Sequence, residues 1–308
     1  MGHKSFFGIL FILLVVVLLG MYWFVPFDSM DFIIKGGNTN FTTGSSNFSD
    51  INSSIQFHKN IRFPSSAISY KIYDCPSNKN KEMLDSFLIV ENLTIVSFYP
   101  VENNELISIT CNEKQRFEEG LFIAGEGGPT RLIQTNLFSV IQKGEISLIR
   151  ESDCPTPNIA LHELFHVLGF KHSENENNIM YPVSKCKQEI GDDMIELINE
   201  LYLIPQQPDL IIENATAIIN GKYLDAQISV RNQGLIISPE SKLVISIGDD
   251  RIKELKLERI DVGYGRVITL TNLFVFKLSI NEIKFEIENE LIELDKENNI
   301  VVLEANKL

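Results

Sequence analysis

The segment HELFHVLGFKH at residues 162–172 constrains this chain more than any other part of it. His162 and His166 are four residues apart, so on a helix both imidazoles lie on one face, one turn apart. Two neutral imidazoles in this arrangement can reach one Zn²⁺ ion at about 2.1 Å each. Gly169 can adopt the left-handed conformation that ends a helix, which lets His172 approach the same metal.

This spacing predicts a zinc ion with three histidine ligands and one open position. An open position is typical of a catalytic zinc site, because a structural zinc has four protein ligands. Glu163 lies next to the ligands but is rotated around the helix, so it need not bind the metal. We therefore expect Glu163 to hydrogen-bond a water molecule in the open position and to act as its general base.

The motif resembles the metzincin clan of metallopeptidases and, within it, the matrixin-like branch. The resemblance rests on the complete HExxHxxGxxH, on Ser173 after the third histidine, and on Met180 in Ile-Met-Tyr-Pro at the spacing of the matrixin Met-turn. Residues 190–202 also look like the helix that closes a matrixin catalytic domain. The resemblance implies an α/β (α+β) domain with a twisted mixed sheet and an active-site helix. It also implies that Met180 forms an apolar floor beneath the histidines.

The chain departs from matrixins in its metal content. It has five histidines, and the two outside the motif, His3 and His58, lie in the N-terminal tail. The extra structural zinc of matrixins therefore has no histidine ligands, and we predict one zinc ion per chain. No Pro-Arg-Cys-Gly switch sequence is present.

Two other metzincin groups fit the sequence less well. Astacin-type sites have a tyrosine ligand two residues after the methionine, where this chain has Pro182. Tyr181 and Pro182 are instead interpreted as walls of the substrate cleft. Archaemetzincins place cysteines soon after the third histidine, whereas the next cysteine here is Cys186.

The four cysteines indicate two disulfides in an oxidising compartment. Three connectivities are possible, and we prefer sequential pairing of Cys75 with Cys111 and of Cys154 with Cys186. The second pair would bracket the zinc motif. Its simplest interpretation is a stabilising crosslink.

The N-terminus predicts a membrane anchor. Residues 6–27 carry no charge and are long enough to cross a hydrocarbon core of about 30 Å. Lys4 precedes this segment and Asp28 and Asp31 follow it, which places the N-terminus in the cytoplasm and the rest outside. We predict an uncleaved signal-anchor transmembrane helix over residues 1–28. A cleaved signal peptide, which would give a secreted protein, is the alternative.

A flexible stalk over residues 29–60 and a catalytic domain over residues 61–204 are expected next. The stalk is rich in Gly, Asn, Ser and Thr. In the catalytic domain, apolar patterning predicts strands at 68–73, 93–98, 106–111, 132–141 and 145–149, a loop at 125–129, and helices at 79–89 and 157–168. By the metzincin resemblance, one of the late strands should be an edge strand that pairs with the substrate backbone.

Residues 205–308 predict a second, all-β domain. Short alternating segments at 209–219, 223–231, 242–247, 267–276 and 283–287 indicate a β-sandwich. The Pro-Asp-Leu opening, the Val-Arg-Asn-Gln-Gly segment at 230–234 and the Glu-Asn-Asn-Ile-Val closing strand resemble the CARDB family of immunoglobulin-like surface domains. No residues in this domain suggest catalysis, and it could bind another surface protein.

The formal charge of −14 disfavours nucleic acid and anionic lipid as partners. An acidic domain can hold Ca²⁺, but no loop has the ordered spacing of calcium ligands, so calcium is possible and not located. The sequence thus predicts a membrane-anchored zinc endopeptidase outside the cytoplasm, acting on protein or peptide substrates. The alternative is a surface adhesion or protein-binding module in which zinc is only structural.

Overall fold

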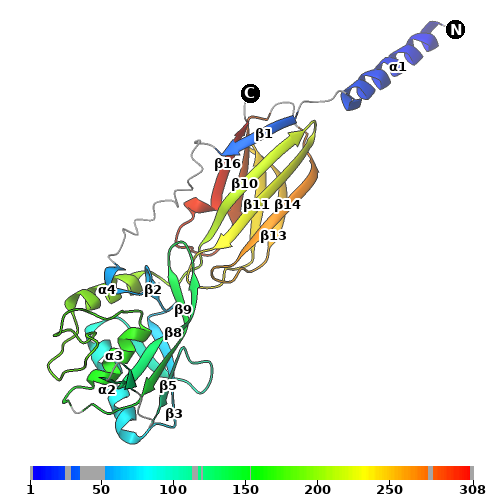
Figure 1. Cartoon of the computed structure of the whole chain (residues 1–308). Coiled ribbons are helices and arrows are strands. Elements are labelled where there is room, and N and C mark those ends of the chain that lie inside the picture. Colours follow the sequence, from blue (N-terminus) through cyan, green and yellow to red (C-terminus); the bar gives the residue numbers. More distant parts are fainter. Residues whose placement is uncertain are drawn as a thin grey trace.

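The computed structural model describes residues 3–24, 29–34, 53–112, 117–118, 121–152, 154–276 and 280–305 (Figure 1). Helix α1 (His3–Phe24) comes first. Nowhere in these described ranges is there a helix that has both the length and the apolarity of a membrane span.

A mixed sheet of six strands forms the centre of the domain predicted to be catalytic, called the catalytic domain from here on. Its strands are β2 (Ile61–Arg62), β3 (Ala67–Tyr73), β4 (Ser97–Pro100), β5 (Ile107–Cys111), β8 (Gly125–Gln134) and β9 (Ser139–Leu148). Strands β4, β3, β5 and β9 lie side by side in parallel, and β2 pairs in parallel with the beginning of β9. β8 pairs antiparallel with β9 and forms an edge of the sheet.

Helices pack against this sheet around one buried core. The helical elements of the domain are η1 (Ser53–Ile55), α2 (Ser77–Leu93), α3 (Asn158–Val167) and α4 (Asp192–Leu203), and a short hairpin is formed by β6 (Phe117–Glu118) and β7 (Leu121–Phe122). On α2, Met83, Phe87 and Val90 repeat at helical spacing and are all buried. They join Leu164 of α3 and Ile109 of β5 in the same apolar cluster, which fixes α3 against the sheet.

Three boundaries differ from the sequence predictions. Residues 125–129, predicted as a loop, are the first half of β8. Glycine and proline usually indicate turns, but an edge strand tolerates both because one of its sides has no ladder partner. The strand predicted at 132–141 is interrupted by the turn between β8 and β9. The strand predicted at 93–98 begins only at Ser97, because α2 continues to Leu93.

The C-terminal domain is an eight-stranded antiparallel sheet in the order β13-β12-β15-β16-β1-β10-β11-β14. Its elements are β1 (Ser29–Ile34), β10 (Leu210–Asn220), β11 (Tyr223–Asn232), β12 (Ser241–Ile247), β13 (Asp250–Leu257), β14 (Gly265–Phe274), β15 (Glu282–Glu288), η2 (Glu297–Asn299) and β16 (Ile300–Ala305). Ile228 of β11 belongs to the same buried cluster as Ile245 of β12 and Phe285 of β15, so the two halves of the sheet share one core. β13 was not predicted, because five of its eight residues are charged and its apolar residues Ile252, Leu255 and Leu257 do not alternate strictly along the sequence.

Strand β1 corrects the prediction of a stalk that begins at residue 29. Residues 29–34 lie between β10 and β16, with Phe32 opposite Ala217 on one side and Ala305 on the other. Both partners are distant in sequence, so no local pattern reveals the pairing. The stalk prediction for residues 35–52 falls outside the described residues.

Candidate active site

The end of α3 directs the chain back toward its own histidines. Gly169 has a positive φ of 101°, and its N–H donates to the carbonyl of His166 at 3.0 Å. The N–H of Phe170 donates to the carbonyl of Phe165 at 3.0 Å, so the two bonds form a Schellman motif. A side chain at residue 169 would also meet the Ile61 side chain at 2.4 Å. Glycine therefore suits both the backbone turn and the packing here.

This turn brings the three histidines of the motif together. One ligand atom from each of His162, His166 and His172 lies within 4.8 Å of the others. The Nε2 atoms of His166 and His172 are 3.1 Å apart, close to the about 3.4 Å expected for two nitrogens on one tetrahedral zinc. Across the described part of the chain, this is the one group of three or more His, Cys, Asp or Glu side chains with such geometry.

Backbone carbonyls orient two of these rings. His162 Nδ1 donates to the Ile179 carbonyl at 2.7 Å, and His166 Nδ1 donates to the Phe170 carbonyl at 2.8 Å. A proton held on Nδ1 leaves Nε2 as a lone-pair donor, which is the tautomer that binds a metal. The histidine set therefore fits a zinc ion.

Electrostatics also favour metal binding by these histidines. Burial, together with the neighbouring His162 and His172, lowers the pKa of His166 to about 4. Burial lowers the pKa of His162 and of His172 as well. All three rings are therefore neutral near pH 7, and neutral imidazole is the form that ligates zinc.

Met180 lies in the turn that supports His162. Its side chain is buried in the core of the catalytic domain, and its carbonyl accepts the N–H of Ser173 at 2.9 Å. The preceding residue, Ile179, provides the carbonyl that orients His162. These two hydrogen bonds hold the segment after α3 against His162 and against the residue that follows His172.

Glu163 is buried beside the histidines and faces the edge strand β8. Only 6% of its surface is exposed. Burial, and secondarily the Glu126 carboxylate, raises the pKa of Glu163 to about 8 in the absence of metal. A divalent cation nearby would favour the ionised carboxylate and lower this pKa.

Two glycines let β8 approach the active-site helix. A Cβ atom at Gly125 would lie 2.7 Å from Glu163 Cγ, and one at Gly127 would lie 2.4 Å from the Glu163 carbonyl oxygen. Real Cβ atoms do not approach other atoms this closely. Sequence reasoning missed this role, although the run Gly-Glu-Gly-Gly was visible at residues 125–128.

We expect Gly127→Ala to lower the hydrolytic activity predicted for this site at least tenfold, because β8 or Glu163 must move to admit the methyl group. The overpacking should also reduce the free energy of unfolding by about 1–3 kcal/mol. Gly128→Ala is the matched control, since no heavy atom lies within 4 Å of a Cβ at that position. Equal activity of the two variants in a peptide-cleavage assay would contradict this close approach.

Residues 53–57 are part of the site, although they were predicted as stalk. The Phe57 ring stacks on the ring of His166, with centroids 5.8 Å apart. The Phe57 N–H donates to the Gly169 carbonyl at 2.9 Å, and Lys171 N–H donates to the Ile55 carbonyl at 3.0 Å. Nothing local in the sequence indicates that this segment crosses the end of α3.

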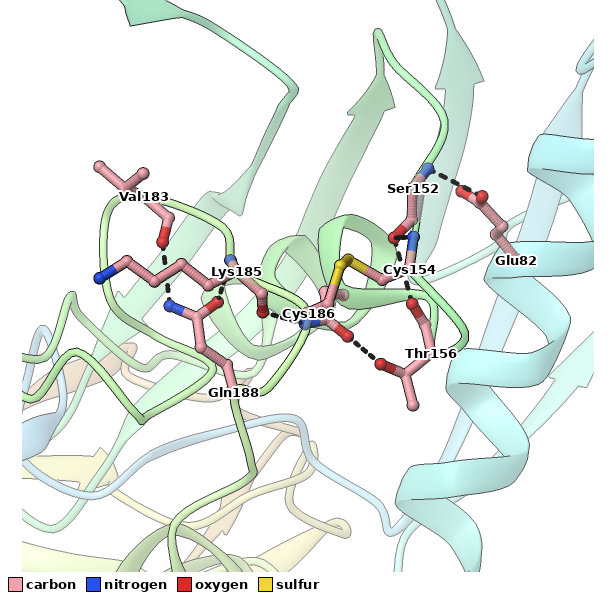
Figure 2. The surroundings of a disulfide bond; sticks show 9 residues. Glu82, Ser152, Cys154, Thr156, Val183, Lys185, Cys186 and Gln188 are labelled. Atoms are coloured by element: carbon pink, nitrogen blue, oxygen red, sulfur yellow. Dashed lines mark hydrogen bonds between the residues drawn. A yellow bond between two sulfur atoms is a disulfide. The ribbon is translucent and has the colours of Figure 1, made fainter.

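A disulfide ties the beginning of α3 to the segment after the Met-turn. The structure contains the pairs Cys75–Cys111 and Cys154–Cys186, the sequential connectivity preferred from the sequence. Near Cys154–Cys186, the Gln188 side chain accepts a hydrogen bond from the Lys185 N–H and donates one to the Val183 carbonyl (Figure 2). Asn158, the first residue of α3, also donates to the Lys185 carbonyl at 2.6 Å. The disulfide and these bonds hold the Met-turn segment against α3.

The residues predicted as cleft walls lie further along the same segment. Tyr181 is half-buried, and Lys185 Nζ lies 5.4 Å from its ring centroid. Pro182 is exposed. Their contact with substrate stays a prediction, as does a calcium site.

Comparisons with known proteins find a matching family model and similar solved structures, including the two that follow. A family model described as Matrixin matches residues 41–203, which is more than half of the 308 residues. No curated protein matches the chain. One similar structure is the CARDB domain of a Pyrococcus furiosus protein in complex with di-metal ions, at 17% identity and a TM-score of 0.24, covering 32% of this chain and 88% of that chain. Another is high choriolytic enzyme 1, a hatching enzyme zinc-protease from Oryzias latipes (medaka fish), at 16% identity and a TM-score of 0.30, covering 49% of this chain and 96% of that chain.

Proposed function

Because this chain belongs to the matrixin family, we propose that it is a zinc-dependent endopeptidase. The observation that carries the proposal is the convergence of three neutral histidines beside the buried carboxylate of Glu163. His162, His166 and His172 would hold the metal. A structural zinc site would have four protein ligands and would not need a general base beside it.

Glu163 is placed to move protons during peptide hydrolysis. When bound, zinc supplies Lewis acidity toward a water molecule and the substrate carbonyl. Glu163 accepts a proton from the attacking water and passes it to the leaving amine. Its burial beneath β8 excludes bulk water from that transfer.

The edge strand β8 is the proposed binding surface for the substrate backbone. β8 pairs with β9 along one side, and within the described residues no strand pairs with its other side. An extended peptide can add to such an edge through main-chain hydrogen bonds, while pockets provide selectivity. Because Gly125 and Gly127 lie against Glu163, a peptide bound to this edge would lie beside the proposed general base.

We also propose that the enzyme acts outside the cytoplasm as a single-pass membrane protein. The uncharged run over residues 6–27, with Lys4 before it and acidic residues after it, supports this orientation. Two disulfides in the described residues agree with an oxidising compartment. A surface-protein partner for the C-terminal domain is part of the same proposal.

Cleavage of a peptide library by the purified, zinc-loaded full-length protein tests the proposed activity. We expect hydrolysis that a chelator abolishes and that added Zn²⁺ restores. The library would at the same time define the residues preferred on each side of the cleaved bond. A protein that retains zinc but cleaves no peptide would instead favour a surface adhesion or protein-binding module.

A further inference from the structure

The C-terminal domain contacts the hairpin that contains the substrate-binding edge. The β8–β9 hairpin extends from the catalytic domain to one end of the C-terminal sheet (Figure 1). There, Phe138 and Val140 of the hairpin are buried in one apolar cluster with Leu235 and Val262 of the C-terminal domain. Ile204, at the end of α4, completes the buried part of this cluster.

The backbone of Gly263 in the C-terminal domain packs closely against the Ile133 side chain of β8. A Cβ atom at Gly263, which has a positive φ of 75°, would lie 2.4 Å from Ile133 Cγ2 on β8. The hairpin turn is itself closed, since Thr135 N–H donates to the Phe138 carbonyl at 2.8 Å. Asn60 Nδ2 also donates to the Leu137 carbonyl at 2.9 Å. The loop around Gly263 therefore rests on a fixed turn.

The C-terminal loops at this junction are fixed by a buried polar network. Asp209 accepts hydrogen bonds from Gln233 Nε2 at 3.0 Å and from Asn298 Nδ2 at 2.9 Å. The Leu235 N–H donates to the Gln207 carbonyl at 2.8 Å, and the Leu294 N–H donates to the Pro208 carbonyl at 3.1 Å. Three loops far apart in sequence are thus joined where the hairpin docks.

The catalytic domain fixes the other side of the junction. Arg62 is 1% exposed, and its guanidinium donates to the carbonyls of Leu201 and Ile204 at the end of α4. The guanidinium also lies over the Tyr202 ring, 4.5 Å from its centroid. These bonds hold Ile204, the residue at which the chain leaves the catalytic domain.

We propose that the C-terminal domain positions the edge strand β8 for substrate binding, with Val262, Gly263 and Leu235 as positioning residues. This inference rests on the proposed peptidase function. α3 holds one end of β8 near Glu163, and the C-terminal domain holds the other end. The strand has 10 residues, so its two ends are about 30 Å apart. The register of β8 shifts twice between Pro129 and Leu132, so the strand between its two supports is irregular. Release of one support would lower the population of the conformation that can pair with a peptide, and the apparent affinity for the peptide would fall in proportion.

The test compares Val262→Asp with Val267→Asp in the zinc-loaded full-length protein. Val262 is 8% exposed at the junction, whereas Val267 on β14 is 60% exposed and lies outside the junction cluster. Two peptides with the same scissile bond serve as substrates, a short one that reaches only Gly125–Gly128 and a long one that reaches Ile133. Backbone hydrogen exchange of residues 130–140 reports on the hairpin directly.

Val262→Asp should speed exchange at residues 130–140 and raise KM for the long peptide roughly tenfold, with kcat retained. Values for the short peptide, and all values for Val267→Asp, should stay at wild-type levels. Val262→Ile keeps an apolar side chain in the cluster and should behave like the wild type. If Val262→Asp does not fold, Val262→Ala takes its place and should show a smaller change of the same kind.

Unchanged exchange, or faster exchange with an unchanged KM for the long peptide, would overturn the positioning role. If the wild-type protein cleaves neither peptide, the proposed peptidase function fails. The exchange measurement then still decides whether the C-terminal domain holds the hairpin.

Discussion

Glu163→Gln should abolish peptide hydrolysis while zinc stays bound. Glutamine has nearly the same shape as glutamate and fits the same buried space beneath β8, but it cannot accept a proton from water. General acid–base catalysis contributes about 10²–10⁴-fold in rate, so we expect kcat to fall by at least that factor. Steady-state cleavage and metal analysis of the same sample would measure both properties.

The exposed residue Glu174 offers a matched control, because it lies two residues after His172 and its side chain faces solvent. Glu174→Gln makes the same chemical change without removing a buried base, so its activity and zinc content should equal those of the wild type. Loss of zinc in Glu163→Gln to the same extent as activity would show that Glu163 binds the metal or supports the fold instead.

The histidine site could be predicted because its information is local. The spacing of His162 and His166 and the turn at Gly169 depend only on helix geometry and on the backbone freedom of glycine. The structure brings these side chains together with His172, and Met180 lies in the turn that supports His162. The parallel strands of the mixed sheet were also largely predictable, since most of them have their own apolar pattern.

The surroundings of the site depend on contacts between distant segments. Phe57 stacks on His166 across more than a hundred residues of sequence, and no periodic pattern encodes that contact. The glycines at 125 and 127 suggested a loop because their close packing against Glu163 becomes visible only once β8 lies over α3. Strand β1 was missed for the same reason, because both of its pairing partners, β10 and β16, lie at least 170 residues further along the chain.

Metal analysis of the oxidised full-length protein should give one zinc ion per chain. Both disulfides are formed in the structure, and oxidised cysteines cannot ligate as thiolates. The three motif histidines are the only such cluster in the described ranges. His172→Ala should therefore weaken zinc binding sharply, because loss of an outer-sphere partner alone costs about 10–100-fold and a direct ligand should cost more.

His58→Ala is the matched control for this measurement, since His58 is exposed and is not among the clustered histidines. Its zinc affinity in a competitive chelator titration should equal that of the wild type. A second tightly bound zinc that survives replacement of all three motif histidines would contradict the single-site prediction. It would point to ligands outside the motif, with reduced cysteines, carboxylates and the remaining histidines as the candidates.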